Sequence, residues 1–195
     1  MHRQLLIKRS IDVVASVVLL LFLLLPVLLL YTLAWLMAKD RSETLLYPDL
    51  RVGWRGKSIV LYKLRTVNPR TGRVSLVRRI MRRSGFDELP QLWNIFKGEM
   101  SFVDPRPLRA NDELVRYGGV PEWRRAVRPG LICTYGLTIH RVQKGTDLYQ
   151  EPVPDAVAVD MDWHYVQEWS LTSDVRVLWY AITTFFYIAR TCFKR

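Results

Sequence analysis

One uncharged, largely apolar run dominates the hydrophobicity pattern of the chain, at residues 13–37. A helix needs about 20 apolar residues to cross the hydrocarbon core of a bilayer, and this run is longer than that. It is also too long for a cleaved signal peptide, and no small-residue cleavage site follows it. The run therefore predicts a helix that is inserted in a membrane.

Two features of this run argue against a simple span. Pro26 lies near its middle, where a proline removes a backbone hydrogen bond and kinks a helix. Basic residues lie on both sides, Lys8 and Arg9 before the run and Lys39 and Arg41 after it, so the positive-inside rule selects no orientation. A helix that bends at Pro26 and returns to its side of entry would place all four cations on one face. The residues alone leave the span and the re-entrant hairpin open.

Residues 58–66 alternate between apolar and polar positions, which predicts a β-strand after a turn at Gly53 and Gly56. The period of a strand places Lys63 and Arg65 on one face. A solvated basic edge strand is the structural alternative. We expect a short β-hairpin here.

Apolar residues in the middle of the chain recur at the spacing of a helix. Asp87 is placed to cap a helix, and Pro90 suits its first turn. The expected apolar face comprises Leu89, Leu92, Trp93 and Phe96. A short helix is expected at residues 109–117, before Gly118. The apolar, aromatic residues 175–193 predict a last helix, either in the core or, as we favour, in the membrane interface. The fold class is thus α+β and mostly helical.

The charge of the chain is strongly positive, with 29 Lys and Arg against 18 Asp and Glu, a formal net charge of +11. Anionic partners are therefore expected: nucleic acid, anionic lipid or a phosphorylated substrate. Seven Trp and nine Tyr favour a membrane interface, where amphipathic rings lie at headgroup level. Cys133 and Cys192 form no close-spaced motif and are expected to be reduced thiols.

Residues 82–107 concentrate the candidate chemistry. Arg82 precedes the adjacent carboxylates Asp87 and Glu88, and the stretch ends in Pro105-Arg106-Pro107. A carboxylate can attack phosphorus, and arginines stabilise the charge that gathers on phosphate oxygens. Neighbouring residues on a helix do not share a face, so the two acids are expected to differ in role. Acids that only complement a helix dipole are the structural alternative.

Taken whole, this stretch resembles the signature of the monotopic phosphoglycosyl transferases, the bacterial sugar transferase family. The landmarks of the resemblance run from Lys8 to Asp174, so it covers nearly the whole chain. It implies that Asp87 is the nucleophile, that Glu88 supports metal binding or positions the pair, and that both acids contact Mg²⁺. It also implies a membrane helix that re-enters at Pro26, although the family's Ser-Pro pair is Leu25-Pro26 here.

Further site residues follow from the same resemblance. The phosphate-binding candidates are Lys63, Arg65, Arg82, Arg106 and Arg128, the last of which opens an Arg-Pro-Gly sequence. Pro105 and Pro107 hold the arginine between them on a stretch of restricted φ. Asp104 stands where the family usually has glycine, and Asp162 and Asp174 are weaker candidates for which a helix-surface position is the alternative. Residues 131–137 depart from the family pattern, so no role is carried over there.

The expected organisation is a re-entrant membrane hairpin over residues 1–40 and a catalytic domain with interfacial helices over residues 41–195, the minimal form of the family. The expected function is Mg²⁺-dependent transfer of a sugar 1-phosphate from a nucleoside diphosphate sugar, UDP by resemblance, to undecaprenyl phosphate. The expected location is the cytoplasmic face of the bacterial inner membrane, with no nucleic-acid partner and a possible homodimer. The alternative is a non-catalytic, membrane-tethered basic module that binds anionic lipid or nucleic acid.

Overall fold

A computed structural model describes residues 2–36, 46–66, 79, 81–82, 85–134 and 155–192. The described elements are, in order, α1 (His2–Leu36), β1 (Leu46–Val52), the 3₁₀ helix η1 (Trp54–Gly56), β2 (Ser58–Leu64), the 3₁₀ helix η2 (Phe86–Gln91), α3 (Leu92–Lys97), β3 (Ser101–Val103), α4 (Ala110–Tyr117), α5 (Glu122–Arg125), β4 (Gly130–Ile132), α7 (Asp155–Gln167) and α8 (Leu171–Cys192). The mostly helical α+β class is confirmed.

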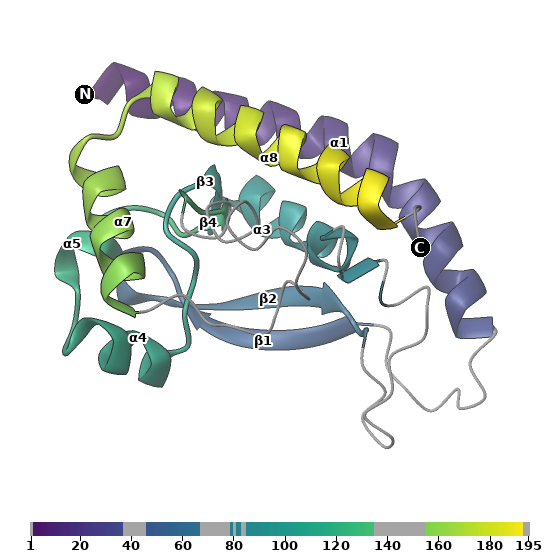
Figure 1. Cartoon of the computed structure of the whole chain (residues 1–195), viewed down its shortest axis with the longest axis horizontal. Helices are drawn as coiled ribbons and strands as arrows, with labels where there is room; N and C mark the ends of the chain where they lie inside the picture. Colours follow the sequence, from purple (N-terminus) through teal and green to yellow (C-terminus); the bar gives the residue numbers. More distant parts are fainter. Residues whose placement is uncertain are drawn as a thin grey trace.

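The elements form a layered body (Figure 1). Helices α1 and α8 run side by side along one edge, and the β1–β2 ribbon forms the opposite edge. Helix α3 and the short strands β3 and β4 lie between these two layers, while α4, α5 and α7 gather at one end. Helix α3 and strands β3 and β4 thus have the N-terminal half of α1 on one side and the β-ribbon on the other.

Two small sheets build the frame. β1 and β2 pair antiparallel, from Leu46 opposite Leu64 to Val52 opposite Ser58, so the expected hairpin is confirmed. β2 ends at Leu64, and Arg65 therefore lies just outside the strand. β3 and β4 pair in parallel, and a Cβ on Gly130 would collide with the main chain of Asp104. Only glycine permits this close approach of the two backbones.

The core joins the β-ribbon to the helices on the other side. Its buried members are Ile59 and Leu61 from β2, Leu92 and Ile95 from α3, Met100, Phe102, Val103, Tyr165 and Val177. The apolar face expected for α3 is partly wrong: Trp93 and Phe96 are 49% and 38% exposed, while Ile95 is fully buried. The reason is that residues 86–91 form a 3₁₀ helix of three residues per turn, which shifts the phase at which the α-helix begins.

Helix α1 bends within the apolar run. The segments Arg3–Leu23 and Pro26–Leu33 meet at 44°, which places the change of direction at the proline. Within the described residues, no unbroken helix combines the length and apolarity of a membrane crossing, whereas this bent pair does so together. The bend agrees with a break at Pro26, and the re-entrant hairpin stays a prediction. Lys39 and Arg41 lie outside the described residues.

Polar contacts fasten the N-terminal turns of α1 to the body. Lys8 Nζ lies 2.7 Å from Asp174 Oδ2 and 3.3 Å from Asp104 Oδ2, and it donates to the carbonyl oxygen of Val103 at 2.7 Å. The Tyr165 hydroxyl donates to Asp174 Oδ1 at 2.6 Å. Asp104 and Asp174 are therefore buried anchors of α1, and the alternative of a helix-surface position for Asp174 is wrong.

Apolar side chains remain exposed along one face of α8. Val175, Trp179, Ile182 and Phe186 recur at helical spacing and are 51–64% exposed. On α1, Val14, Leu21, Phe22 and Leu29 are similarly exposed. Exposed apolar side chains in such number on neighbouring helices are typical of a membrane-contacting face.

Candidate active site

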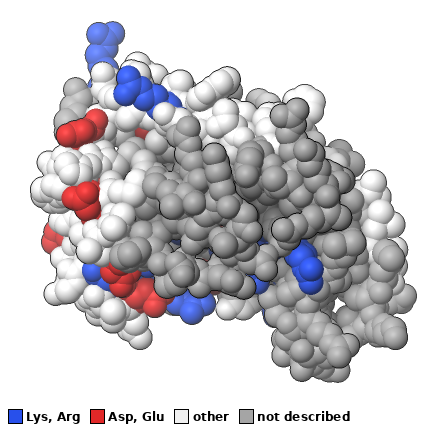
Figure 2. Space-filling view, in the orientation of Figure 1, with Lys and Arg blue, Asp and Glu red and all other residues white. Residues whose placement is uncertain are grey.

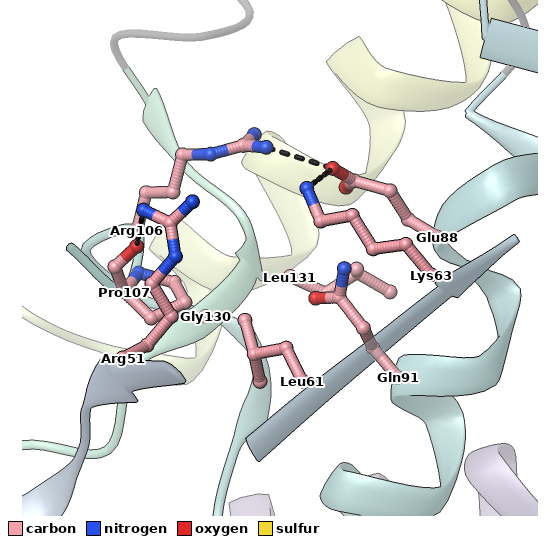
Figure 3. Close-up of a pocket in the computed structure, with 9 residues that line it drawn as sticks. All are labelled: Arg51, Leu61, Lys63, Glu88, Gln91, Arg106, Pro107, Gly130 and Leu131. Carbon is pink, nitrogen blue, oxygen red and sulfur yellow. Dashed lines mark hydrogen bonds and ion pairs between the residues drawn. The ribbon is translucent and has the colours of Figure 1, made fainter. Parts of the chain in front are cut away.

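Two cations from different parts of the chain meet at one oxygen of Glu88 (Figure 3). Lys63 Nζ, near the end of β2, lies 2.7 Å from Glu88 Oε1, and an Arg106 nitrogen lies 2.7 Å from the same atom. Glu88 belongs to η2, and Arg106 follows β3. The recess around this cluster is lined by Arg51, Leu61, Lys63, Glu88, Gln91, Arg106, Pro107, Gly130 and Leu131.

The ionisation of Glu88 is fixed by this cluster. Burial alone would raise the pKa of its carboxyl, but the charges and hydrogen bonds of Arg106 and Lys63 outweigh burial and lower that pKa to about 2. Glu88 is therefore a permanent anion at neutral pH. Its fixed charge organises two cations that would otherwise repel each other.

Asp87 has the opposite tendency. Burial, together with the adjacent negative charge of Glu88, raises the pKa of Asp87 to about 6, while Lys63 and Arg82 act to lower it. At pH 7 and above the carboxylate is mostly ionised, yet it is more basic than an ordinary aspartate. A basic, partly desolvated carboxylate is suited to nucleophilic attack. The adjacent acids thus differ in character, as expected from their positions on a helix.

The start of η2 explains how the two acids are presented. Gly85 adopts a left-handed conformation at its N-cap, with φ of 74°, and Asp87 lies in the first turn rather than at the cap position. The expected capping role of Asp87 is therefore wrong. Both carboxylates still lie at the N-terminal end of the helix, where main-chain N–H groups favour negative charge. The side chains of Asp87 and Glu88 leave this turn in different directions, since residues one apart do not share a face.

The Pro105-Arg106-Pro107 turn is held by its carbonyl groups. Gly130 donates its main-chain N–H to the Pro105 carbonyl at 2.9 Å, and Arg51 Nη1 donates to the Pro107 carbonyl at 3.4 Å. Restricted φ at the two prolines leaves Arg106 few alternative backbone conformations. Arg106 is thereby directed at Glu88.

The remaining phosphate-binding candidates are Arg82, Arg65 and Arg128. Arg82 is exposed, and its charge reaches Asp87. The Arg65 guanidinium lies 5.4 Å from the centre of the Tyr47 ring. Arg128 donates to the Gly98 carbonyl at 3.0 Å and stacks 4.4 Å from the centre of the Trp54 ring, and it does not line the recess.

Asp162 lies apart from the acid pair. It is 1% exposed, and its Oδ2 accepts hydrogen bonds from Tyr117 at 2.5 Å and from Arg124 at 3.2 Å. The alternative of a helix-surface acid is therefore wrong. With Asp104 and Asp174 paired to Lys8, all three weaker acidic candidates are buried and engaged by cations.

Sequence reasoning missed two polar side chains of the recess, Arg51 and Gln91. Arg51 is paired with Asp49, with Nη2 at 2.5 Å from Oδ2. Gln91 is 3% exposed, and its Nε2 has no hydrogen-bond partner among the described residues. Gln91 follows Glu88 by three positions, and in a 3₁₀ helix such residues eclipse each other on one face. A 3₁₀ reading of residues 86–91 would have placed Gln91 in the site.

The donor set at the acid pair is compatible with Mg²⁺. Among the described residues no group of three or more His, Cys, Asp or Glu side chains could hold a metal on its own. Mg²⁺ in phosphate-handling sites commonly takes one or two carboxylates, with waters and substrate phosphates as its other ligands. The carboxylates of Asp87 and Glu88 match that arrangement, in which the substrate completes the site.

The chain is similar to known proteins over most of its length. The model of the family described as bacterial sugar transferase matches residues 3–187. The chain is 35% identical over 185 residues to the UDP-glucose:undecaprenyl-phosphate glucose-1-phosphate transferase of Caulobacter vibrioides, covering 88% of this chain and 66%, just under two thirds, of that protein. It is 33% identical to the exopolysaccharide production protein ExoY of Sinorhizobium fredii, covering 90% of this chain and 83% of the relative.

A longer relative extends the comparison. The undecaprenyl-phosphate galactose phosphotransferase of Salmonella typhimurium is 28% identical over 203 residues, and the match covers 88% of this chain but 39% of that protein. Because the family model spans almost the whole chain and the match includes the acid pair and the Pro-Arg-Pro turn, the sequence resemblance is confirmed. The chain belongs to the bacterial sugar transferase family.

Proposed function

We propose that this protein transfers a sugar 1-phosphate from a nucleoside diphosphate sugar, a UDP-sugar by analogy with its relatives, to undecaprenyl phosphate. The product is a polyprenyl diphosphate sugar, the first membrane-bound intermediate of a bacterial glycoconjugate. Relatives named for UDP-glucose and for undecaprenyl-phosphate galactose transfer support the two substrate classes.

The reaction proceeds in two displacements at one phosphorus atom. In the first, a carboxylate oxygen of Asp87 attacks the β-phosphorus of the donor, the bond from that phosphorus to the bridging oxygen breaks, and UMP leaves. In the second, a phosphate oxygen of undecaprenyl phosphate attacks the same phosphorus, and the aspartyl–phosphorus bond breaks. The Asp87 carboxylate is thereby regenerated. Splitting one transfer into two steps is the advantage of a covalent intermediate.

The other residues of the cluster stabilise charge. Arg106 and Lys63 stand 2.7 Å from Glu88 before substrate arrives, so both cations are positioned in advance next to Asp87. Arg82 adds a further positive charge near the nucleophile. Asp87 and Glu88 would hold Mg²⁺ together with the donor diphosphate, and the ion would neutralise charge on the phosphate oxygens.

Membrane attachment would bring the two substrates together. The bend in α1 at Pro26 and the exposed apolar faces of α1 and α8 support a re-entrant helix and an interfacial helix. A chain that enters and leaves on the cytoplasmic face of the inner membrane would hold the acid pair where a soluble donor and a lipid acceptor both reach it.

The observation that carries this proposal is the convergence of Lys63 and Arg106 on Glu88 Oε1, each at 2.7 Å, directly beside Asp87, in a chain of the bacterial sugar transferase family. The test is to incubate the protein with UDP-sugar and Mg²⁺, without acceptor, and to examine the peptide containing Asp87 by mass spectrometry. A phosphosugar adduct on that peptide is expected, with UMP release abolished in Asp87→Asn. Retained turnover in Asp87→Asn, or turnover that never leaves an adduct, would refute the proposed mechanism.

A further inference from the structure

The Pro105-Arg106-Pro107 turn is held through its carbonyl groups, because the two prolines have no N–H to donate. The Pro105 and Pro107 carbonyls accept from Gly130 and Arg51, as described above. The third carbonyl, that of Arg106 itself, accepts from Nη2 of Arg124 on α5. This last contact acts on the residue whose side chain meets Glu88.

Arg124 is itself fixed from several sides. It is 5% exposed, and its Nη1 lies 3.1 Å from Glu113 Oε1 on α4, while its Nε lies 3.2 Å from Asp162 Oδ2 on α7. Its guanidinium also lies 5.2 Å from the centre of the Tyr117 ring. Each edge of the planar fork therefore has a separate acceptor, a geometry that a lysine ammonium cannot reproduce.

Charge explains why this arrangement is rigid. Glu113 and Asp162 are 0% and 1% exposed, so each buried carboxylate requires a cation close by. Acidic side chains of the described residues gather, mixed with basic ones, toward the end of the molecule that carries α4, α5 and α7 (Figure 2). Helices α4 and α7 thus fix Arg124, and Arg124 in turn holds the main chain of Arg106.

We propose that Arg124 is a positioning residue of the transferase: it fixes the backbone of Arg106 so that the Arg106 side chain meets Glu88 and the donor phosphate. This inference rests on the proposed function and adds to it a role for α4, α5 and α7. It also gives Asp162 a part in the site, through Arg124 rather than through a metal or substrate.

Arg125 offers a matched control on the same helix. It pairs with the other oxygen of the same carboxylate, with Nη2 at 2.6 Å from Glu113 Oε2, and it lies beside Gly56 rather than beside Arg106. Replacing either arginine by lysine keeps one positive charge near Glu113. Only Arg124→Lys removes the hydrogen bond to the Arg106 carbonyl.

The first experiment compares UMP release by Arg124→Lys and Arg125→Lys in detergent, with kcat and the KM for donor measured separately. We expect Arg124→Lys to lower kcat about 10- to 100-fold, because a small displacement of a positioned group is costly, and Arg125→Lys to lower it less than threefold. The comparison is repeated in an Arg106→Lys background, where the loss caused by Arg124→Lys should shrink to less than threefold. Equal losses in both backgrounds, or equal kcat in the two single variants, would overturn the inference.

Asp162→Asn provides a second variant should Arg124→Lys not fold. It keeps Arg124 but weakens one of its anchors, so a smaller kcat loss, again suppressed in the Arg106→Lys background, is expected. A loss of the same size in both backgrounds would mean that Asp162 acts on stability alone and would count against the proposed chain of contacts.

A readout without turnover separates this inference from the proposed function. Carbon-13 NMR of the Glu88 carboxyl reports whether Arg106 still lies against it. In Arg124→Lys the carboxyl chemical shift of Glu88 should change as its contact with Arg106 is lost, and in Arg125→Lys it should stay as in the unsubstituted protein. If the Glu88 signal is the same in both variants, Arg124 does not position Arg106, whatever the enzyme transfers. If the unsubstituted protein releases no UMP but the Glu88 shift occurs, the proposed function fails and the positioning stands.

Discussion

Lys63 and Glu88, 25 positions apart, meet at 2.7 Å between Nζ and Oε1 and so tie the β-ribbon to the turn that carries the acid pair. This contact has two electrostatic consequences. The lysine keeps Glu88 ionised, and its charge also lowers the pKa of the neighbouring Asp87. A single cation from β2 therefore acts on both carboxylates, in the same direction.

Lys63→Gln is expected to move the acid limb of the pH–rate profile upward. Burial and Glu88 raise the pKa of Asp87 to about 6, and removal of Lys63 leaves less to oppose them. UMP release, which requires ionised Asp87, should then reach half its maximum about one pH unit higher. The measurement is initial UMP release between pH 5 and 9. Lys57→Gln, at the exposed position just before β2, should leave the limb in place. A limb that moves down, or equally in both variants, contradicts the assignment.

Glu88→Gln should move the same limb in the opposite direction. Its negative charge raises the pKa of Asp87, so the neutral amide lets Asp87 ionise at lower pH. The maximal rate should nevertheless fall by about 10- to 100-fold, because Arg106 and Lys63 lose the anion that positions them. Together, a lower rate and a lower pH midpoint distinguish this role from that of a general acid, whose loss would remove a limb from the profile.

Lys8→Met is expected to destabilise the protein by about 3–5 kcal/mol, because it leaves Asp104 and Asp174 buried without their shared cation. The measurement is the free energy of unfolding in detergent, obtained from a denaturant titration that is monitored by tryptophan fluorescence.

Lys97→Gln is the control for this prediction. Lys97 pairs with Glu99 at 2.7 Å, but the side chains are 37% and 32% exposed, so the loss should stay below about 1 kcal/mol. If the two substitutions cost the same, the contacts of Lys8 are not what fastens α1 to the body.

Gln91→Met should weaken donor binding without weakening the fold. The amide of Gln91 is buried at the recess, and its Nε2 has no partner within the described residues, so an apolar side chain of similar length removes no bond within the protein. We expect the KM for the nucleotide sugar to rise about tenfold while the unfolding midpoint stays unchanged or rises.

Asn94→Leu provides the contrast. The Nδ2 of Asn94 donates to the Val60 carbonyl at 2.9 Å and to Glu99 at 2.7 Å, so this substitution should lower stability by about 1–3 kcal/mol and leave the KM unchanged. A Gln91→Met variant that melts early with normal KM would show that Gln91 supports the fold and not the donor.

Sequence patterns predicted the structure best for elements whose formation depends on short-range spacing of residues. Alternation predicted β2, and glycine with helical spacing predicted α4, because strand and helix periods are short-range properties. The pattern around Asp87 placed the acid pair at the start of a helix, as the structure has it, but gave the wrong helix phase. A 3₁₀ turn followed by an α-helix has no single period, so Trp93 and Phe96 were placed in the core although they are exposed.

Such local patterns do not predict ion pairs between residues that are far apart in the chain. Asp162 and Asp174 looked like surface acids because their burial depends on Arg124 and Lys8, which are 38 and 166 positions away. Arg51 was overlooked for the same reason, since its contact with the Pro107 carbonyl joins β1 to the turn after β3. Burial of a charge depends on the partner that three-dimensional folding supplies.

The exposed face of α8 gives a last prediction, on the membrane. Trp179 and Phe186 are 64% and 63% exposed on the same side of the helix as Val175 and Ile182. If this face lies in the lipid interface, an environment-sensitive fluorophore on Phe186→Cys should emit at shorter wavelength in nanodiscs than the same dye on Asp160→Cys of α7, an exposed position on a polar surface. Both variants are made in a Cys192→Ser background, and Cys133 is buried. Equal emission at the two positions would place α8 in water, because an apolar helix face that contacts lipid cannot leave its label fully hydrated.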